Sequence, residues 1–258
     1  MTRTRFYNTE AVVLKKNELG EADSILTLYT PNRGKVRAVA RGVRRPKSKL
    51  GGHVELLTYS QMSLSQSKSL DIITQSQTID SFLPLRDDLW RTSQALYVVE
   101  IIGQSTAEEE SNYPLFKLLV DTLHWLCQAH DSETTLRCFE LHLSQCLGYR
   151  PQLYECLCCR NSLKTDDSFY FTPTGGGVIC HHCRNRESMV FPLSRNALKT
   201  MRYLQRSDYA SADRLRVKPE LSSELKRLMQ GYIRYLLERR VKSGEWLDRL
   251  KREGLSLD

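Results

Sequence analysis

The segment RGKVRAVARGVRRPKSK, residues 33–49, has the most distinctive pattern in the chain. Eight of its 17 residues are Lys or Arg and none is acidic. Its first half alternates basic and small apolar side chains, as a strand with one solvent face and one core face does. On a strand over residues 35–41, the solvent face would hold Lys35, Arg37 and Arg41, and the core face Val36, Ala38 and Ala40. The sequence therefore predicts a strand with a cationic face, continued by a basic loop that begins at Gly42.

Such a surface suits the phosphate backbone of a nucleic acid. Edge strands also carry Lys and Arg simply to prevent pairing with other strands, but a few charges suffice for that purpose. Residues 1–50 hold 12 basic and 4 acidic residues, a net charge of +8 that equals the charge of the whole chain. The predicted DNA-binding residues are Arg33, Lys35, Arg37, Arg41, Arg44, Arg45, Lys47 and Lys49.

Composition places the chain among globular proteins, with 40% hydrophobic and 26% charged residues. A length of 258 residues favours two or three domains. The start, MTRTRFYNTE, lacks the apolar run of a signal peptide, and no stretch approaches the roughly 18 apolar residues of a membrane span. We therefore expect a soluble, cytoplasmic protein whose eight cysteines are reduced rather than paired as disulfides.

Residues 1–82 show the alternation of apolar and polar side chains that is typical of short strands. Apolar runs between turn residues predict five strands, over residues 7–16, 24–29, 35–41, 54–66 and 70–82. Five short strands suit a small barrel, and the oligonucleotide-binding (OB) fold is a five-stranded barrel that presents strands to nucleic acids. We predict an OB-fold barrel over residues 1–82. Strand count alone leaves an SH3-like barrel or a sandwich open.

Beyond residue 82 the apolar residues recur at helical spacing. Pro114 suits the first turn of a helix, and Ser194 can cap another. The predicted helices are a segment that begins at Leu85, then 114–129, 133–147, 195–205, 221–240 and 246–250. The chain is therefore predicted to be multidomain α+β. Its second domain, residues 83–258, would be helical and carry a zinc ribbon inserted at about residues 151–190.

The most specific motif is a pair of cysteine pairs, CLCC at 156–159 and CHHC at 180–183. Each pair can place two thiolates on one side of a tight turn, and two such knuckles supply four sulfur ligands for tetrahedral zinc. The residues between them flank a Thr-Pro-Thr-Gly-Gly turn and predict a short hairpin. We predict one structural zinc ion (Zn2+) on Cys156, Cys159, Cys180 and Cys183. Whether Cys158, His181 or His182 can substitute at one position stays open.

Other cysteines and histidines carry no such pattern. Cys127, Cys138 and Cys146 fall singly in the predicted helices, where a cysteine is usually a small buried hydrophobe. No catalytic residue is predicted. Two aromatic residues in predicted strands, Tyr29 and Tyr59, could stack on bases or point into the barrel, and the sequence does not decide between these.

A second basic block occupies the C-terminal end. Residues 199–252 contain 15 basic and 7 acidic residues. The two signs interleave at helical spacing, as on any solvated helix face. The sequence does not decide whether this block contacts DNA. Its candidate residues are Arg234, Arg239, Arg240 and Lys242.

Several motifs resemble those of the RecO family of bacterial recombination mediators, over nearly the whole chain. In the N-terminal part they are Gly20-Glu21-Ala22-Asp23, Tyr29-Thr30-Pro31, Gly34-Lys35-Val36, Ala40-Arg41-Gly42-Val43-Arg44 and Lys47-Ser48. In the C-terminal part they are Leu147-Gly148-Tyr149, Pro151 and the two cysteine pairs. The resemblance implies an OB-fold barrel, a helical domain with a zinc ribbon, and a role in recombination and repair rather than catalysis.

The resemblance also implies partners that no spacing in the sequence shows. The family helps RecA load onto single strands coated by single-strand-binding protein (SSB), acts with RecR, and anneals complementary strands. The implied partners are thus single- and double-stranded DNA, RecR and SSB, at the nucleoid. Two other classes stay open: a zinc-ribbon RNA- or DNA-binding factor without recombination partners, and a zinc-dependent nucleic-acid enzyme. The enzyme is disfavoured, because the chain lacks a Walker-type loop and the His-x-Glu context of zinc deaminases.

Overall fold

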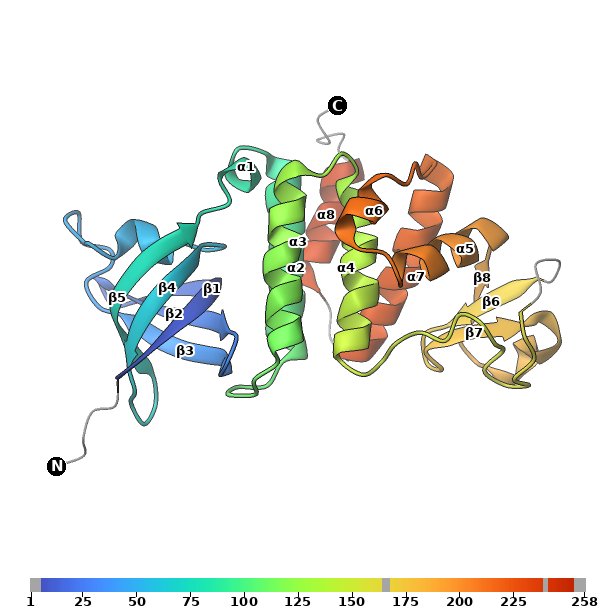
Figure 1. Ribbon diagram of the computed structural model, residues 1–258, viewed down its shortest axis with the longest axis horizontal. Coiled ribbons are helices and arrows are strands. Elements are labelled where there is room, and N and C mark those ends of the chain that lie inside the picture. Colours follow the sequence, from blue (N-terminus) through green and yellow to red (C-terminus); the bar gives the residue numbers. More distant parts are fainter. Residues whose placement is uncertain (1–5, 164–167, 239–240, 253–258) are drawn as a thin grey trace. The chain divides into compact units, whose positions relative to one another are not determined.

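Five strands close into a barrel at the N-terminal end of the chain (Figure 1). The structure, a computed structural model, describes residues 6–163, 168–238 and 241–252. The barrel order is β1-β2-β3-β5-β4, and this closed five-stranded barrel confirms the predicted OB-like fold. The strands are β1 (Phe6–Leu19), β2 (Asp23–Thr30), β3 (Gly34–Ala40), β4 (Tyr59–Ser65) and β5 (Asp71–Asp80).

The barrel core collects one face of each strand. On β3, Val36, Ala38 and Ala40 are buried while Arg37 between them is exposed, which confirms the predicted alternation. The core cluster also contains apolar residues of the other strands: Ala11, Val13, Leu26, Leu28, Met62, Leu64 and Ile73. Burial of this apolar set is the main stabilising contribution to the barrel.

Several predicted strand boundaries differ from the observed ones, and two of these differences change how the residues are interpreted. β3 ends at Ala40, so Arg41 lies in the following loop, where Gly42 has a φ of +63°. The other error concerns residues Gly51–Val54, which form a 3-10 turn (η1), so that β4 begins only at Tyr59. Val54 is fully buried in the barrel core. Its apolar character therefore reflects its position in the core and not membership of a strand.

Gly34 begins β3 at a place where a side chain does not fit. Its φ is +60°, and a Cβ there would lie 1.8 Å from the carbonyl oxygen of Glu110. The Glu110 segment runs this close because it covers the edge of β3, where the Glu109 N–H donates to the Lys35 carbonyl at 3.0 Å. β3 pairs with β5 through only two residues, so this segment covers backbone groups that would otherwise be exposed.

The chain divides into two compact units. The barrel unit comprises residues 1–128 and 242–258, and the ribbon unit residues 129–241. The helices beyond the barrel are thus shared between the units. Those of the barrel unit are α1 (Leu83–Arg86), α2 (Leu89–Ser105), α3 (Tyr113–Gln128) and α8 (Lys242–Arg252). Among the described helices of both units, none is long and apolar enough to cross a membrane.

The C-terminal helix α8 packs against α2 (Figure 1). Glu100 of α2 accepts hydrogen bonds from the backbone N–H groups of Lys242, at 3.0 Å, and Ser243, at 2.8 Å. A carboxylate at this position satisfies N–H groups that have no partner within the helix, and it complements the helix dipole. Leu247 and Leu250 are buried and anchor the apolar side of α8.

In its described residues, the ribbon unit combines four helices with a three-stranded sheet in the order β7-β6-β8. Its helices are α4 (Ser132–Cys146), α5 (Arg195–Leu204), α6 (Tyr209–Asp213) and α7 (Pro219–Leu237); its strands are β6 (Phe169–Thr172), β7 (Gly177–Cys180) and β8 (Phe191–Leu193). The predicted hairpin is confirmed as β6 and β7, and Ser194 caps α5 as predicted, with Oγ accepting from the Ala197 N–H at 3.0 Å. The sequence did not predict β8 or α6.

Candidate nucleic-acid surface and metal centre

Five of the eight predicted DNA-binding residues lie on one exposed loop between β3 and η1. They are Arg41, Arg44, Arg45, Lys47 and Lys49. We call residues 41–49 the basic loop. Arg44 connects this loop to the β1–β2 turn, where its N–H donates to the Ala22 carbonyl at 2.9 Å, and to the end of β1, where its guanidinium pairs with Glu18 at 3.0 Å. Within the described residues the other four side chains form no ion pair, so the loop holds a block of unneutralised charge.

Lys35 lies on β3 but its ammonium is bound within the protein. Nζ donates to the carbonyl of Gly103 at 2.8 Å and also to the carbonyl of Thr106. These carbonyls belong to the C-terminal end of α2, where helix carbonyls lack an intrahelical partner and the dipole favours a cation. Lys35 therefore closes the end of a helix.

Arg33 is likewise engaged inside the barrel unit. Its guanidinium carbon lies 4.4 Å from the centre of the Tyr7 ring. Its terminal nitrogens lie 3.3 Å from a Glu109 carboxylate oxygen and 3.9 Å from an oxygen of Asp71. These contacts hold the start of β3 against β1, β5 and the segment after α2.

Arg37 is exposed, but it lines a cleft of about 640 Å³ between the barrel and helices α2 and α8. Lys15 and Lys242 add positive charge to this cleft, whereas Glu100 and Glu108 add negative charge. The β3 face is therefore less cationic than the run of basic residues in its sequence indicated. The basic loop is the part of the segment with the most available charge.

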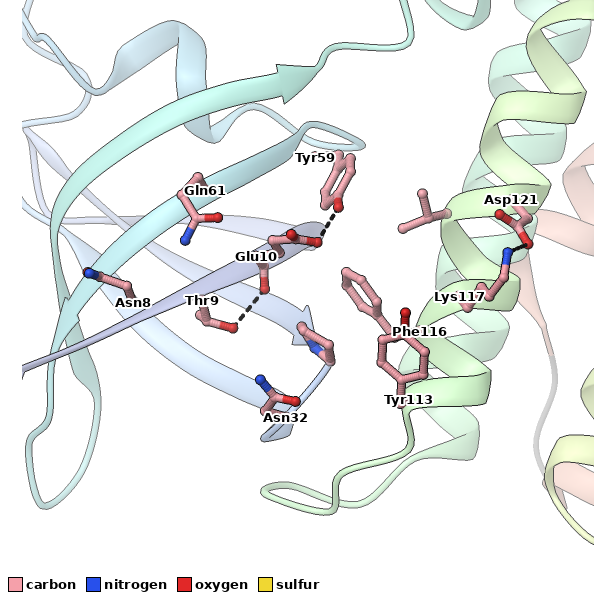
Figure 2. Close-up of a pocket in the computed structure, with 12 residues that line it drawn as sticks. Asn8, Thr9, Glu10, Asn32, Tyr59, Gln61, Tyr113, Phe116, Lys117 and Asp121 are labelled. Atoms are coloured by element: carbon pink, nitrogen blue, oxygen red, sulfur yellow. Dashed lines mark hydrogen bonds and ion pairs between the residues drawn. The ribbon is translucent and has the colours of Figure 1, made fainter.

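A second pocket, of about 470 Å³, lies between β1, β4 and α3 (Figure 2). The Tyr59 hydroxyl donates to the Glu10 carboxylate, and burial together with this bond raises the pKa of Tyr59 above its ordinary value. Lys117 on the opposite wall pairs with Asp121 at 2.6 Å. This pocket thus offers aromatic, amide and carboxylate groups and little available positive charge. Tyr29 is fully buried, so its ring cannot stack on a base.

The four cysteines of the two predicted pairs converge in the ribbon unit. The Sγ atoms of Cys156, Cys159, Cys180 and Cys183 all lie within 4.8 Å of one another. The first two precede β6, Cys180 ends β7, and Cys183 lies in a 3-10 turn, η2 (His181–Arg186). Among the described residues no histidine or carboxylate joins this set. Four thiols at such separations could hold a metal ion in the predicted tetrahedral manner.

Backbone hydrogen bonds favour a thiolate at one of these cysteines. Burial opposes ionisation of Cys156, but the N–H groups of Cys159, Cys180 and Cys158 bond to its sulfur and lower its pKa to about 6. The Cys180 nitrogen lies 3.4 Å from this sulfur. Burial and the neighbouring thiols raise the pKa of Cys183 to about 12. A bound cation would favour ionisation of all four sulfurs.

The cysteines outside this set have different surroundings. Burial raises the pKa of Cys158, which lies in the first knuckle, and His181 and His182 are exposed. Cys138 is fully buried and burial raises its pKa to about 12, as expected of a small core residue. The two remaining cysteines, Cys127 and Cys146, are only partly buried, and neither belongs to the set of four thiols.

Two family models match the chain, described as Recombination protein O N terminal, over residues 1–82, and Recombination protein O C terminal, over residues 86–245. The chain belongs to the RecO family. It is 41% identical to the DNA repair protein RecO of Dehalococcoides mccartyi strain ATCC BAA-2266, across 99% of this chain and 100% of that protein. It is 39% identical to the DNA repair protein RecO of Roseiflexus sp. strain RS-1, across 95% of this chain and 86% of that protein.

As a RecO family chain it is a DNA repair and recombination protein and not an enzyme. The resemblance drawn from its motifs is thereby confirmed. Of the C-terminal candidates, Arg234 is exposed on α7, and Lys242 is exposed at the start of α8. Arg239 and Arg240 lie outside the described residues.

Sequence reasoning missed the residues that engage Arg33 and Lys35. Lys35 meets Gly103 across 68 positions of sequence, and Arg33 meets Glu109 across 76. No local pattern reports such a pairing. The run of acidic residues at 108–110 is the one signal in the sequence that a segment complementary to the basic strand exists.

Proposed function

We propose that this RecO family chain binds DNA through the basic loop. The observation that carries the proposal is the exposed charge of Arg41, Arg45, Lys47 and Lys49 on a loop that hydrogen bonds fix beside the β1–β2 turn. In OB folds the nucleic-acid face uses strands 2 and 3 together with connecting loops, including the loop between strands 1 and 2. Cations at that rim would neutralise backbone phosphates.

Binding of this kind depends on phosphates and not on base identity. Affinity then comes from released counterions, falls with salt, and shows little preference among sequences. Single strands and duplexes share the phosphate backbone, so both are expected to bind. In this proposal Arg37 extends the surface from β3, while Arg33 and Lys35 act through the fold because the protein itself engages their charges.

We further propose that the four clustered thiols bind one structural zinc ion. Sulfur ligands suit zinc, and four of them leave no coordination position for a water molecule. Zinc on Cys156, Cys159, Cys180 and Cys183 would join the first knuckle to β7 and η2. It would thereby stabilise a small sheet that buries little apolar surface of its own.

The finer role follows from the family. We propose that the chain anneals complementary strands and, together with RecR, helps RecA load onto DNA coated by SSB, at the nucleoid in the cytoplasm. Membership of the family described as Recombination protein O supports this proposal. A mediator must stay bound to DNA while another protein leaves the strand. A cationic loop that contacts phosphates and not bases can supply that binding.

Charge reversal tests the basic loop. Arg41→Glu combined with Lys47→Glu changes two exposed side chains outside the core, so the fold should persist. Four or five phosphate contacts predict a log–log salt slope of about −3 for single strands, and the double variant should flatten that slope by about 1.4. Arg216→Glu combined with Lys218→Glu makes the same change of charge at exposed positions of the ribbon unit and serves as the control.

Strand annealing provides the functional measurement. The loop variant should anneal SSB-coated complementary strands more slowly than the parent, whereas the control variant should match the parent. If the loop variant binds and anneals like the parent at physiological salt, the DNA surface lies elsewhere and the proposal fails.

A further inference from the structure

Helix α5 and the turn that follows it carry a one-sided stripe of positive charge. Lys199 and Arg202 lie on α5, and Arg206 lies two residues beyond its end, so that the three follow at intervals of three and four residues. Leu198 and Met201 on the other side of the helix are buried. Residues 195–207 contain no acidic residue. Unlike the rest of the C-terminal basic block, this stretch does not interleave the two signs. Its charged side chains therefore have one sign, unlike the mixed charges on the surface of an ordinary solvated helix.

Two arginines of the stripe share one exposed aromatic ring. The guanidinium carbon of Arg202 lies 5.0 Å from the centre of the Tyr154 ring, and that of Arg206 lies 5.8 Å from it. Tyr154 is 37% exposed, and Tyr203 beside the arginines is 40% exposed. Arg150 joins the group through a hydrogen bond of 3.3 Å to Gln205. Cations thus alternate with accessible tyrosine rings on one surface of the ribbon unit.

The backbone fixes both guanidinium groups and leaves their outer nitrogens available. Nε of Arg202 donates to the Leu153 carbonyl at 2.8 Å, and Nε of Arg206 donates to the Arg202 carbonyl at 3.2 Å. Within the described part of the chain no carboxylate pairs with either arginine. Burial lowers the pKa of Arg202, and the charge of Arg206 adds to this effect while Tyr154 opposes it. Two like charges held together without an acid form a site that an anion would stabilise.

The predicted metal knuckle positions the ring. Tyr154 lies two residues before Cys156, its N–H donates to the Gln152 side chain at 3.0 Å, and its carbonyl accepts from the Leu163 N–H at 3.1 Å. Arg202 therefore bonds to the same short segment that supplies the first thiol. The ribbon thus holds Tyr154 in place beside Arg202 and Arg206.

We propose that Arg150, Tyr154, Lys199, Arg202, Tyr203 and Arg206, the α5 patch, form a second DNA surface that binds single strands. The inference rests on the proposed DNA binding and extends it to the ribbon unit. Guanidinium forks fit phosphate oxygens, and accessible tyrosine rings offer stacking platforms for unpaired bases. A duplex keeps its bases stacked inside, which is why the aromatic rings favour a single strand as the ligand.

With a second surface, the chain has two separate DNA-binding sites, one in each unit. One strand can bind at the basic loop while another binds at the α5 patch. Annealing needs two strands held by one protein or by a pair of proteins. Loss of the α5 patch is therefore expected to slow annealing as well as to weaken the binding of a single strand.

Charge reversal at Lys199 and Arg206 tests the cationic part. Lys199→Glu with Arg206→Glu should flatten the salt slope for a labelled 40-nucleotide single strand by about 1.4, which corresponds to about 25-fold weaker binding at 0.1 M salt. Arg216→Glu with Lys218→Glu is the matched control in the same unit and should behave like the parent. An unchanged slope in the α5 variant, or an equal loss in the control, would overturn the inference.

Tyr154 variants test the aromatic part. Tyr154→Ala should weaken single-strand binding several-fold without changing the salt slope, because the ring is uncharged, whereas Tyr154→Phe should match the parent. Photo-crosslinking of a bromodeoxyuridine strand should label a peptide that contains Tyr154 or Tyr203. Equal weakening of duplex binding in the alanine variant would overturn the single-strand assignment. If the parent binds no DNA, the proposed function itself fails; if only the α5 variants match the parent, the inference alone fails.

Discussion

The Lys35 ammonium donates a hydrogen bond of 2.8 Å to the carbonyl oxygen of Gly103. It also donates to the Thr106 carbonyl, so it closes the C-terminal end of α2. A residue in the middle of a predicted DNA-binding run therefore has a structural role. Net charge along a sequence and charge available to a ligand are different quantities, and packing within the barrel unit separates them.

This role predicts the effect of Lys35→Met. Removing a charged donor from two backbone carbonyls should lower the free energy of unfolding by about 1.5–3 kcal/mol. Lys47→Met, which neutralises an exposed residue of the basic loop, should leave stability within about 0.5 kcal/mol of the parent. Urea unfolding measures the first effect, and the salt slope for DNA should respond mainly to Lys47→Met. A stable Lys35→Met variant with a flattened slope would contradict this assignment.

Gly34→Ala should be among the most destabilising small substitutions in the barrel. The residue has a positive φ, and a Cβ would meet the Glu110 carbonyl at 1.8 Å, so the covering segment would have to move. Left-handed strain alone costs about 1 kcal/mol, and we expect about 2 kcal/mol or more in total. Gly52→Ala is the control, because a Cβ there meets nothing within 4 Å. Similar thermal unfolding of the two variants would refute this explanation.

The sequence could predict features that local chemistry determines. Val36, Ala38 and Ala40 alternate with basic residues, and period two alone assigns them to a core face. Likewise, the spacing of the two cysteine pairs predicts that the four sulfurs converge, since each pair needs only a tight turn to place two thiolates on one side. These predictions needed no knowledge of distant residues, and the structure confirms the buried face and the convergence of the four sulfurs.

Features that depend on distant partners could not be predicted in the same way. The sequence predicts a strand that includes the apolar Val54, because a residue that enters the barrel core from a turn has no periodic signal of its own. The return of α8 to the barrel unit depends on Glu100, 142 positions before Lys242. The α5 patch joins Tyr154 to arginines 48 and 52 positions later, in a block that looked like a mixed solvated surface.

Glu100→Ala should loosen α8. The carboxylate accepts hydrogen bonds from the Lys242 and Ser243 N–H groups and from the Ser243 hydroxyl, so its loss uncaps the helix. We expect a loss of about 1–2 kcal/mol in the stability of α8. Amide hydrogen exchange in α8 should accelerate, while the strands of the barrel keep their protection. Ser243→Ala removes only the hydroxyl bond and should have a smaller effect; an equal effect would show that Glu100 does not act through the backbone.

If zinc binds at the four clustered thiols, substitution of a cysteine inside the set and of a neighbouring cysteine outside it should have opposite outcomes. The parent should contain one zinc per chain by elemental analysis. Cys180→Ser removes one of the four converging sulfurs, so zinc should be lost, and the ribbon should become less soluble and more open to proteases. Metal binding in small zinc sites is worth about 10 kcal/mol or more, which the apolar contacts of a short three-stranded sheet cannot replace.

Cys158→Ser is the matched control, because it removes a thiol of the same knuckle that lies outside the set of four. It should retain zinc and parental protease resistance. In both variants the barrel should stay folded, since its core cluster contains no ribbon residue. DNA binding by the basic loop should therefore survive in Cys180→Ser, while binding through the α5 patch should weaken, because Tyr154 would lose the knuckle that orders it. A zinc-free parent, or loss of zinc from Cys158→Ser as complete as from Cys180→Ser, would contradict the assignment of ligands.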